Sequence, residues 1–426
     1  MKVLIISNNC FSKSQNMGKT LSSIFSAFDK SEICQLFFYS SVPDATMCED
    51  YFRISDYDLL KGKLWGTIGQ IVVPKTSRDQ QLYESDNIRK VYSTFNRNKA
   101  SVALARTILW DISRWNSESL NEWVKNMNPD CIFFASGDTI FSYKIVAYIS
   151  KKFKIPVISY VCDEFFEGYE GKGILGRIYH TRLKKWICNV IGNSQKLAVI
   201  CESLGEFYKK IFGCEYIVLN TGTDIKGDDN ERQSCSNNIA YLGNIGLNRW
   251  KSLIEIGQAL SFLNKKYSKN YKLNIYSGET DEHILNNLRS IDTICFKGRV
   301  TSEECLNIIK NSKAVIHTES FETSDINRVK YSMSTKIADS LASGTCLFAY
   351  GSSELASIQY LSKHRCAVVA TNKDELKSQL FRVLENTQIR NECIEQALEI
   401  AQMNHNAINN SIRFRKDCLD IIGEKL

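Results

Sequence analysis

Short apolar runs alternate with longer helical patterns along most of this 426-residue chain. In the first half the runs cover 3–6, 33–38, 131–135, 157–161, 197–200 and 216–219. Helical patterns lie between them, over 19–28, 100–127, 140–152, 174–188 and 203–212. Such alternation is typical of parallel strands joined by helical crossovers. It predicts an α/β fold of doubly wound, Rossmann-like parallel sheets.

The stretch 220–238 is almost entirely polar, and the strand–helix pattern restarts after it. Polar, glycine-containing stretches between periodic segments are typical of linkers. We therefore expect an N-terminal domain over 1–220, a linker over 221–238 and a C-terminal domain over 239–406. The less regular segment 40–100 is interpreted as an insertion of short helices and loops.

Composition excludes several classes of protein. A hydrophobic content of 43% argues against disorder, and no apolar run reaches the roughly 18 residues of a membrane helix. The 15 cysteines include no CxxC pair and no Cys/His cluster with zinc spacing, which favours thiols in a reducing cytoplasm and no metal site. The net charge of +7 favours an anionic ligand or surface, whereas no nucleic-acid-binding signature is present.

The first strand is followed by a loop that contains Gly18 and leads into a helix. The loop has neither GxGxxG nor a P-loop pattern, which argues against a dinucleotide-dependent oxidoreductase. We expect it to line a cleft between the domains.

A strand, a glycine turn and then cations open the second half: Gly243 and Asn244 follow the strand, and Arg249 and Lys251 begin a helix. Glycine lets the backbone approach a phosphate, and the cations and helix N-terminus stabilise its charge. A plain turn with solvated cations is the open alternative. If these residues bind a phosphate, Arg249→Ala should cut turnover and leave the melting temperature nearly unchanged.

A second anion-binding pattern lies at 334–344. Ser334 or Thr335 can cap a short helix that carries Lys336 and Asp339. The helix N-terminus favours an anion by roughly 0.3–2 kcal/mol. Asp339 is then placed to accept hydrogen bonds from ribose hydroxyls, and Lys336→Ala is expected to behave as Arg249→Ala does.

The segment from Lys336-Ile-Ala-Asp339 to Gly344 resembles a stretch of retaining nucleotide-sugar glycosyltransferases of the GT-B fold, closest to family 4 in its polysaccharide-biosynthesis branch. Three further passages fall in that family's order: 182–224, Tyr241-Leu-Gly243-Asn244 with Arg249, and Phe296-Lys-Gly298-Arg-Val300. The resemblance covers roughly 1–20 and 155–400.

The resemblance implies two Rossmann-like domains facing a central cleft, with the acceptor on the first and a nucleotide-diphosphate sugar on the second. It implies that the last helix, about 407–426, packs back onto the first domain. It also implies transfer with retention and no required metal or other cofactor. The implied donor-binding set is Gly243, Asn244, Arg249, Lys251, Gly278, Arg299, Ser334, Thr335, Lys336 and Asp339.

The sequence departs from the family at its paired glutamates. Asp339 matches the second glutamate, but strict spacing places Tyr331 at the first. Glu319 or Glu322 is expected to take that role. Candidate catalytic acids are Glu319 together with Asp138 and Asp163, which follow predicted strands of the first half.

Some side chains keep two interpretations. Asp163 and its neighbour Glu164 fit either an acceptor-side role or helix capping, and His317 fits either strand-end packing or a ligand contact. Asp56-Tyr-Asp58 has the spacing of a DxD metal motif but follows no apolar strand, so we do not assign it a metal.

The helix over 174–188 has apolar residues at three- and four-residue steps, which predicts one apolar face: Ile174, Leu175, Ile178, Tyr179, Leu183, Trp186 and Ile187. Arg177, Arg182, Lys184 and Lys185 are expected off that face, and no acid lies between Glu170 and Glu202. A core-packed helix with solvated cations and a peripheral contact of 172–188 with an anionic membrane both stay open.

The predicted function is transfer of a sugar from a nucleotide-diphosphate donor to a glycan or lipid-linked acceptor, in the cytoplasm or at its membrane face, in cell-surface polysaccharide synthesis. Two alternatives stay open. One is a nucleotide-sugar epimerase of the same fold, and the other is a non-catalytic partner subunit that lacks the glutamate pair.

Overall fold

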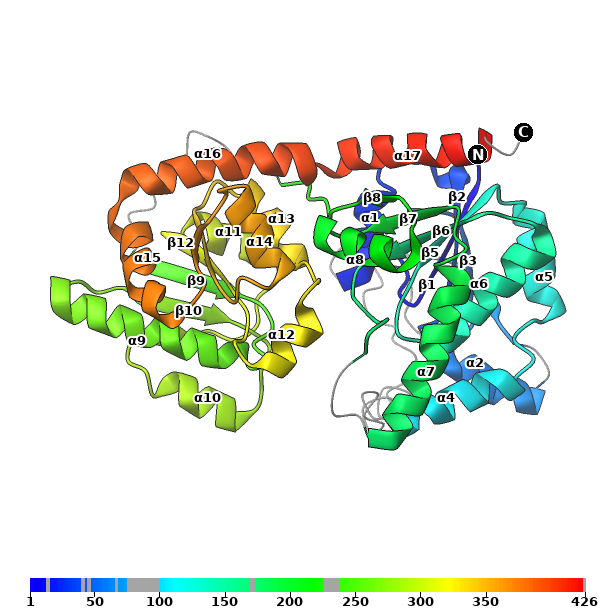
Figure 1. Ribbon diagram of the computed structural model, residues 1–426, viewed down its shortest axis with the longest axis horizontal. Helices are drawn as coiled ribbons and strands as arrows, with labels where there is room; N and C mark the ends of the chain where they lie inside the picture. The colour runs from blue at the N-terminus through cyan, green and yellow to red at the C-terminus, as the bar shows by residue number, and fades with distance from the viewer. Residues whose placement is uncertain are drawn as a thin grey trace. The chain divides into compact units, whose positions relative to one another are not determined.

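The computed structural model describes residues 1–12, 16–39, 43, 47–65, 68–74, 100–168, 173–225 and 237–423. The chain divides into two compact units (Figure 1). Unit 1 consists of Met1–Thr221 and Ala407–Leu426, and unit 2 consists of Gly222–Asn406. Most of the expected linker, together with Glu170 and Lys172, lies outside the described residues.

Unit 1 is built on an eight-stranded sheet in the order β4-β3-β2-β1-β5-β6-β7-β8. The strands are β1 (Val3–Ser7), β2 (Ile33–Phe37), β3 (Asp50–Arg53), β4 (Gln70–Val72), β5 (Cys131–Ala135), β6 (Val157–Val161), β7 (Lys196–Val199) and β8 (Tyr216–Val218). All pairs are parallel except β3 with β4. The central strands β1 and β5 are buried throughout and apolar except for Ser7, as expected for a parallel sheet covered on both faces.

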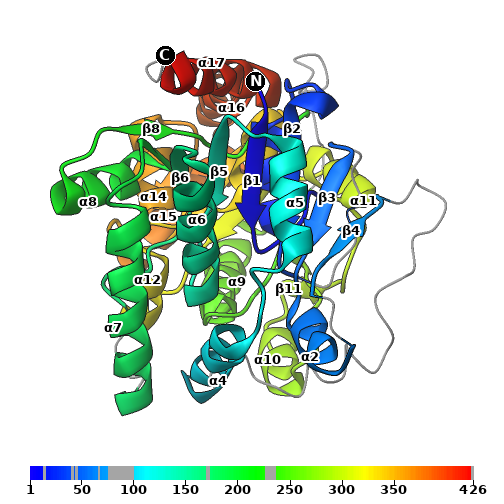
Figure 2. The ribbon, with the colours of Figure 1, turned by 90° about the vertical axis from the view of Figure 1, so that its right-hand side faces the viewer.

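Helices cover the sheet of unit 1, and the last helix of the chain is one of them (Figure 2). The helices are α1 (Asn16–Ile24), η1 (Lys30–Glu32), α2 (Asp56–Trp65), α4 (Ala100–Ile112), α5 (Glu118–Met127), α6 (Ile140–Phe153), α7 (Gly173–Val190), α8 (Glu202–Phe212) and α17 (Ala407–Gly423). The ring of Phe414 packs on Phe25 and Phe133 at centroid distances of 5.7 and 5.3 Å. Ser411 Oγ accepts a hydrogen bond from the backbone of Ala27, which ties α17 to the segment after α1.

Unit 2 is built on a fully parallel sheet of six strands in the order β11-β10-β9-β12-β13-β14. The strands are β9 (Asn238–Leu242), β10 (Lys272–Tyr276), β11 (Ile294–Phe296), β12 (Ala314–Thr318), β13 (Leu347–Tyr350) and β14 (Val368–Ala370). The helices are α9 (Arg249–Tyr267), α10 (Glu282–Arg289), α11 (Ser302–Lys310), α12 (Thr323–Val329), α13 (Thr335–Ala342), α14 (Ala356–Lys363), α15 (Lys373–Glu385) and α16 (Thr387–Asn404).

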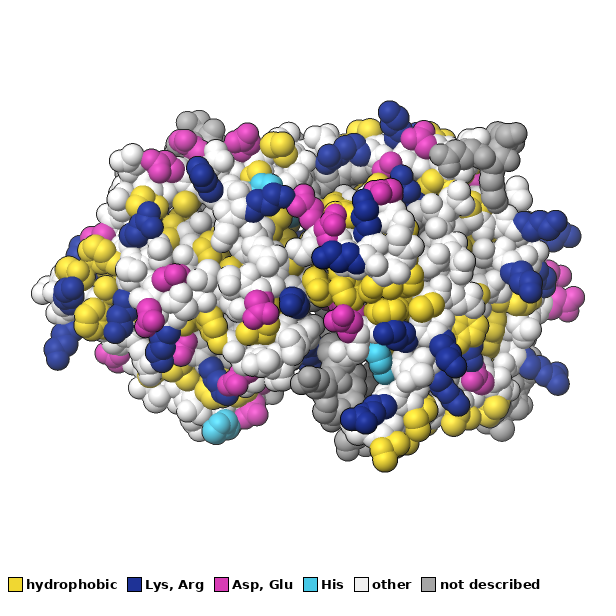
Figure 3. All heavy atoms as spheres, viewed as in Figure 1, with side chains coloured by type: hydrophobic (Ala, Val, Ile, Leu, Met, Phe, Trp, Pro, Cys, Tyr) yellow, Lys and Arg dark blue, Asp and Glu magenta, His cyan; other side chains and the backbone are white. Residues whose placement is uncertain are grey.

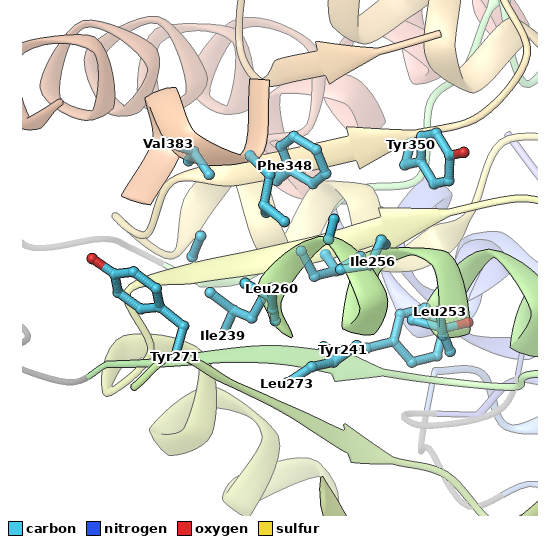
Figure 4. Packing of buried hydrophobic residues seen from close by; sticks show 14 of the residues in the cluster. Ile239, Tyr241, Leu253, Ile256, Leu260, Tyr271, Leu273, Phe348, Tyr350 and Val383 are labelled. Carbon is cyan, nitrogen blue, oxygen red and sulfur yellow. The ribbon is translucent and has the colours of Figure 1, made fainter. Parts of the chain in front are cut away.

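The core of unit 2 has two layers, one on each face of the sheet. Figure 4 shows Leu253, Ile256 and Leu260 of α9 packed with Ile239 and Phe348 of the strands. The second layer joins α13, α14 and α16 to the other face. In open α/β sheets covered on both faces, ligands bind at the carboxyl ends of the strands.

The alternation of apolar runs therefore predicted the α/β class correctly, but several details differ. The segment 40–100 contains β3 and β4, which extend the sheet of unit 1. The helix expected over 100–127 is two helices, α4 and α5. The short helix α12 was not expected. No helix within the described ranges is long and apolar enough to cross a bilayer.

Candidate functional site

The predicted donor-binding residues of unit 2 gather where its parallel strands end. Gly243 follows β9, Gly278 follows β10 and Arg299 follows β11. The backbone N–H of Gly243 donates to the carbonyl of Tyr276, at 2.9 Å. A Cβ at Gly278 would lie 3.7 Å from Cδ of Arg299, so these two residues are neighbours. Ligands of open α/β sheets bind at this carboxyl edge.

Gly243 allows a cation to approach the end of β9. A Cβ at Gly243 would lie 2.9 Å from Lys336 Nζ, which is closer than real Cβ contacts allow. Lys336 belongs to the first turn of α13, where Ser334 caps the helix by accepting the N–H of Lys336 at 3.4 Å. Thr335 is the first helical residue. A helix N-terminus with a lysine beside it favours an anion.

Arg249 and Glu319 form the central ion pair of this edge. Arg249 Nε donates to Glu319 Oε2 at 2.7 Å, and the two side chains are only 19% and 10% exposed. The backbone of Glu319 is held on both sides: its N–H donates to Tyr350, and its carbonyl accepts from Ser252 Oγ. The ion pair therefore joins the start of α9 to the end of β12 in one arrangement.

Burial shifts the titration of this pair. It raises the pKa of the Glu319 carboxyl, while Arg249 and Lys336 hold back part of the rise. Burial also acts to lower the pKa of Arg249, but the charge of Glu319 and its hydrogen bond leave that pKa above its ordinary value. The ionised form of Glu319 thus depends on Arg249.

The turn before Arg249 has an unusual backbone. Leu247 and Asn248 have positive φ angles of 53° and 52°, a left-handed conformation that costs a leucine free energy. The Asn248 amide donates to the carboxylate of Asp325 on α12, at 2.9 Å. This contact holds the turn and so fixes where Arg249 begins α9.

The side chain of Asn244 is used within the same turn. Its Oδ1 accepts the N–H of Gly246 at 2.6 Å, and its backbone carbonyl accepts from the Tyr241 hydroxyl at 2.7 Å. Asn244 therefore shapes the turn after β9. No sequence pattern pointed to Asp325, which lies in α12, the short helix that was not expected.

His317, at the end of β12, is neutral. Burial and the nearby Arg249 and Lys336 lower the pKa of its imidazole to about 3. Its Nε2 is buried and has no hydrogen-bond partner within the described residues. Packing at the strand end is the interpretation that this burial favours.

Two predicted donor-binding side chains contact other residues of unit 2. Lys251 Nζ lies 2.7 Å from Glu322, and both side chains are about half exposed. Asp339 Oδ1 accepts a hydrogen bond from the Thr223 hydroxyl at 2.7 Å. Thr223 belongs to the segment by which the chain enters unit 2, so Asp339 also anchors that segment.

The candidates of unit 1 take different positions. Gly18 lies within α1 and not in the loop where it was expected. A Cβ at Gly18 would lie 2.6 Å from the carbonyl oxygen of Cys10, so the absence of a side chain lets the helix approach this carbonyl. Asp138 is exposed after β5, and its backbone carbonyl accepts from the Tyr179 hydroxyl at 2.5 Å. Asp163 follows β6, with its carboxylate 3.9 Å from the Cys162 sulfur.

Other acids of unit 1 have structural contacts. The Glu164 carboxylate caps a turn by accepting the N–H groups of Phe166 and Glu167, and burial raises its pKa. Asp56 accepts from Arg106 and from the Trp110 indole, at 2.8 and 2.7 Å. Within the ranges that the structure describes, no three His, Cys, Asp or Glu side chains form a group suited to a metal ion.

Comparison with solved structures identifies the fold. Sucrose-phosphate synthase from Thermosynechococcus elongatus superimposes with a TM-score of 0.65 and 9% identity, over 100% of both chains. HepE of Anabaena in complex with UDP superimposes with a TM-score of 0.61 and 11% identity, over 99% of this chain and 100% of the HepE chain. The apo form of the lipopolysaccharide outer core galactosyltransferase WaaB gives 0.57 and 13% identity, over 100% of both.

The chain therefore has the GT-B fold, as the sequence predicted. A family model described as glycosyl transferase-like matches residues 258–414, which lie mostly in unit 2. No curated protein matches the sequence. The match covers the stretch with Glu319, Lys336 and Asp339, but begins after Gly243 and Arg249.

Proposed function

We propose that this protein is a glycosyltransferase that moves a sugar from a nucleotide-diphosphate donor to a glycan or lipid-linked acceptor, with retention at the anomeric carbon. The observation that carries the proposal is that Lys336, at the N-terminus of α13, lies beside Gly243, while Arg249 and Lys336 both act on the Glu319 carboxylate. Two cations and a helix N-terminus at one sheet edge suit a diphosphate.

The chemistry follows from where charge develops. During transfer the bond between the anomeric carbon and the β-phosphate oxygen breaks, and the diphosphate gains negative charge. The acceptor hydroxyl oxygen forms the new bond, and its proton leaves with the departing diphosphate. Fixed cations aimed at the leaving oxygen stabilise that charge without reorganisation. In this proposal Lys336 and Arg249 perform that task, and no bound metal is required.

The other predicted residues take supporting roles in the proposal. Gly278, Arg299 and Asn244 border the nucleotide at the same edge, and Ser334 and Thr335 present backbone N–H groups to it. Asp339 binds ribose and Glu319 lies near the reacting sugar. Asp138 and Asp163 serve the acceptor, in support of which they follow adjacent parallel strands of unit 1.

The comparisons guide the choice of donor. HepE, a structural neighbour, was crystallised with UDP and with UDP-glucose, so UDP-glucose is the first donor to test. A thermal-shift screen should show stabilisation by the true donor, because a ligand at 100 times its dissociation constant contributes about 2.7 kcal/mol. If no nucleotide sugar shifts the transition, the protein is a non-catalytic partner subunit.

A second assay separates transfer from epimerisation. A transferase releases free nucleotide only when an acceptor is present, whereas an epimerase converts the sugar without an acceptor and releases no nucleotide by transfer. Acceptor-dependent release supports the proposal. Acceptor-independent change of the sugar would replace it with the epimerase function.

A further inference from the structure

The first turns of α7 expose apolar side chains. Ile174 is 77% exposed, Leu175 48% and Ile178 43%. The sequence predicted that these residues share one face with Leu183 and Ile187, and that prediction was wrong. Leu183 and Ile187 are buried, and at roughly 100° per residue Leu183 lies opposite Ile174.

The neighbouring helix α4 adds exposed apolar residues to the same part of unit 1. Helices α4 and α7 pack against each other, and Ile108 and Ile112 of α4 are 55% and 60% exposed. Figure 3 shows hydrophobic side chains along the edge of unit 1 over α4 and the N-terminal end of α7, with Lys and Arg side chains beside them. We call this the α4–α7 surface.

Four exposed cations border the apolar residues of α7: Arg177, Arg182, Lys184 and Lys185. By helical geometry Lys185 lies on the same side as Ile174, and Arg182 lies between Ile178 and Leu175. The prediction that the four cations lie off the apolar residues was therefore wrong for Arg182 and Lys185. None of the four pairs with a carboxylate of the described chain, and Asp111 of α4 is paired with Lys144.

Exposed apolar residues alone do not define a partner, as α17 shows. Ile408 and Ile412 are 49% and 55% exposed there, but Asp417 and Asp420 follow on the same helix. The described part of α7 carries no acid. Apolar side chains with unpaired cations and no acid suit a surface that is negative outside and apolar beneath.

We propose that the α4–α7 surface binds an anionic lipid bilayer, with Ile174, Leu175 and Ile178 entering the interface and Arg182 and Lys185 contacting headgroup phosphates. The contact is peripheral, and it places unit 1 at a membrane face. It does not depend on the donor site of unit 2, so each can fail without the other.

The test is sedimentation of the full chain with vesicles of phosphatidylcholine alone or mixed with phosphatidylglycerol. Wild type should sediment only with the mixed vesicles, and less in 1 M than in 0.1 M salt, because the Debye length falls from about 10 to about 3 Å. Arg182→Ser/Lys185→Ser should lower the partition coefficient roughly 30-fold, at about 1 kcal/mol per cation. Ile174→Ser/Ile178→Ser should lower it at least 10-fold, an order-of-magnitude value for two apolar side chains.

Ile408→Ser/Ile412→Ser is the matched control, since it removes similarly exposed isoleucines from the same unit and should bind vesicles as wild type does. Melting temperatures and the donor-induced thermal shift should be unchanged in all three variants. Wild type that stays in the supernatant with mixed vesicles at 0.1 M salt overturns the proposal. The proposal is also overturned if Ile174→Ser/Ile178→Ser still binds vesicles but no longer self-associates. The partner of the α4–α7 surface would then be a second copy of the chain.

Discussion

Replacing Arg249 with alanine should destabilise the protein, contrary to the expectation from sequence alone. The Arg249–Glu319 pair has an N–O distance of 2.7 Å and side-chain exposures of 19% and 10%. Exposed pairs contribute about 0–1 kcal/mol, whereas removing one partner of a buried pair costs about 3–5 kcal/mol. The low exposure places this pair near the buried case, so we expect a loss of about 3 kcal/mol in the free energy of unfolding.

The cost should come from the carboxylate left behind. Burial already raises the pKa of Glu319, and removing Arg249 removes the largest effect that opposes this rise. When the pKa of a carboxyl is higher in the folded than in the unfolded protein, the free energy of unfolding falls as pH rises towards the folded-state pKa. The deficit of Arg249→Ala should therefore be largest at pH 8 and shrink towards pH 5, where protonated Glu319 needs no cation.

Urea unfolding followed by circular dichroism at both pH values measures the deficit. The double variant Arg249→Ala/Glu319→Gln should recover much of the loss at pH 8, because the neutral amide needs no counter-charge. Lys336→Ala, at an exposed position of the same edge, should unfold nearly as wild type does. Wild-type stability for Arg249→Ala at pH 8, or a deficit independent of pH, would refute this reasoning.

Three further outcomes are expected. The free energy of unfolding of wild type should fall as pH drops from about 6.5 towards 3, because His317 binds a proton in the unfolded protein but stays neutral in the folded one. His317→Gln should show a smaller fall when unfolding is measured as a function of pH. Asp339→Ala should weaken donor binding in calorimetry, whereas Thr223→Val should lower stability in urea by about 1–3 kcal/mol and leave donor affinity unchanged. Asn248→Ala should be less stable in urea than Asn248→Gly, since both lose the bond to Asp325 but only glycine tolerates the left-handed backbone without strain.

The parallel sheets could be predicted because most of their strands are short runs dominated by apolar residues. Strands β1 and β5 are buried along their whole length, so a run of Val, Ile, Leu and Phe was sufficient evidence. Strands β3 and β4 were missed because they are short and contain polar residues, and because β4 is the edge strand of the sheet. Helix α7 was misjudged because its apolar residues fall on two sides of the helix.

Only part of the candidate site could be predicted. Gly243, Arg249 and Lys336 were assigned from local chemistry: a turn, a cation and a helix N-terminus. The partner of Arg249 could not be assigned, because Glu319 is distant in sequence and meets it only since β9 and β12 are neighbours in the sheet. The contact of Asp339 with Thr223 could not be predicted either, because the two residues are far apart along the chain and meet only in the folded unit.

The most direct test of the donor site is calorimetric titration of UDP into wild type and Lys336→Ala. Lys336 is exposed beside Gly243, so its removal should change the charge at the site and leave the fold intact. Losing a charge-assisted hydrogen bond costs about 1.5–3 kcal/mol, which corresponds to roughly 10- to 150-fold weaker binding. We expect UDP to bind wild type, and to bind Lys336→Ala more weakly by that factor. Equal affinity for the two proteins, or no binding of UDP to wild type, would contradict it.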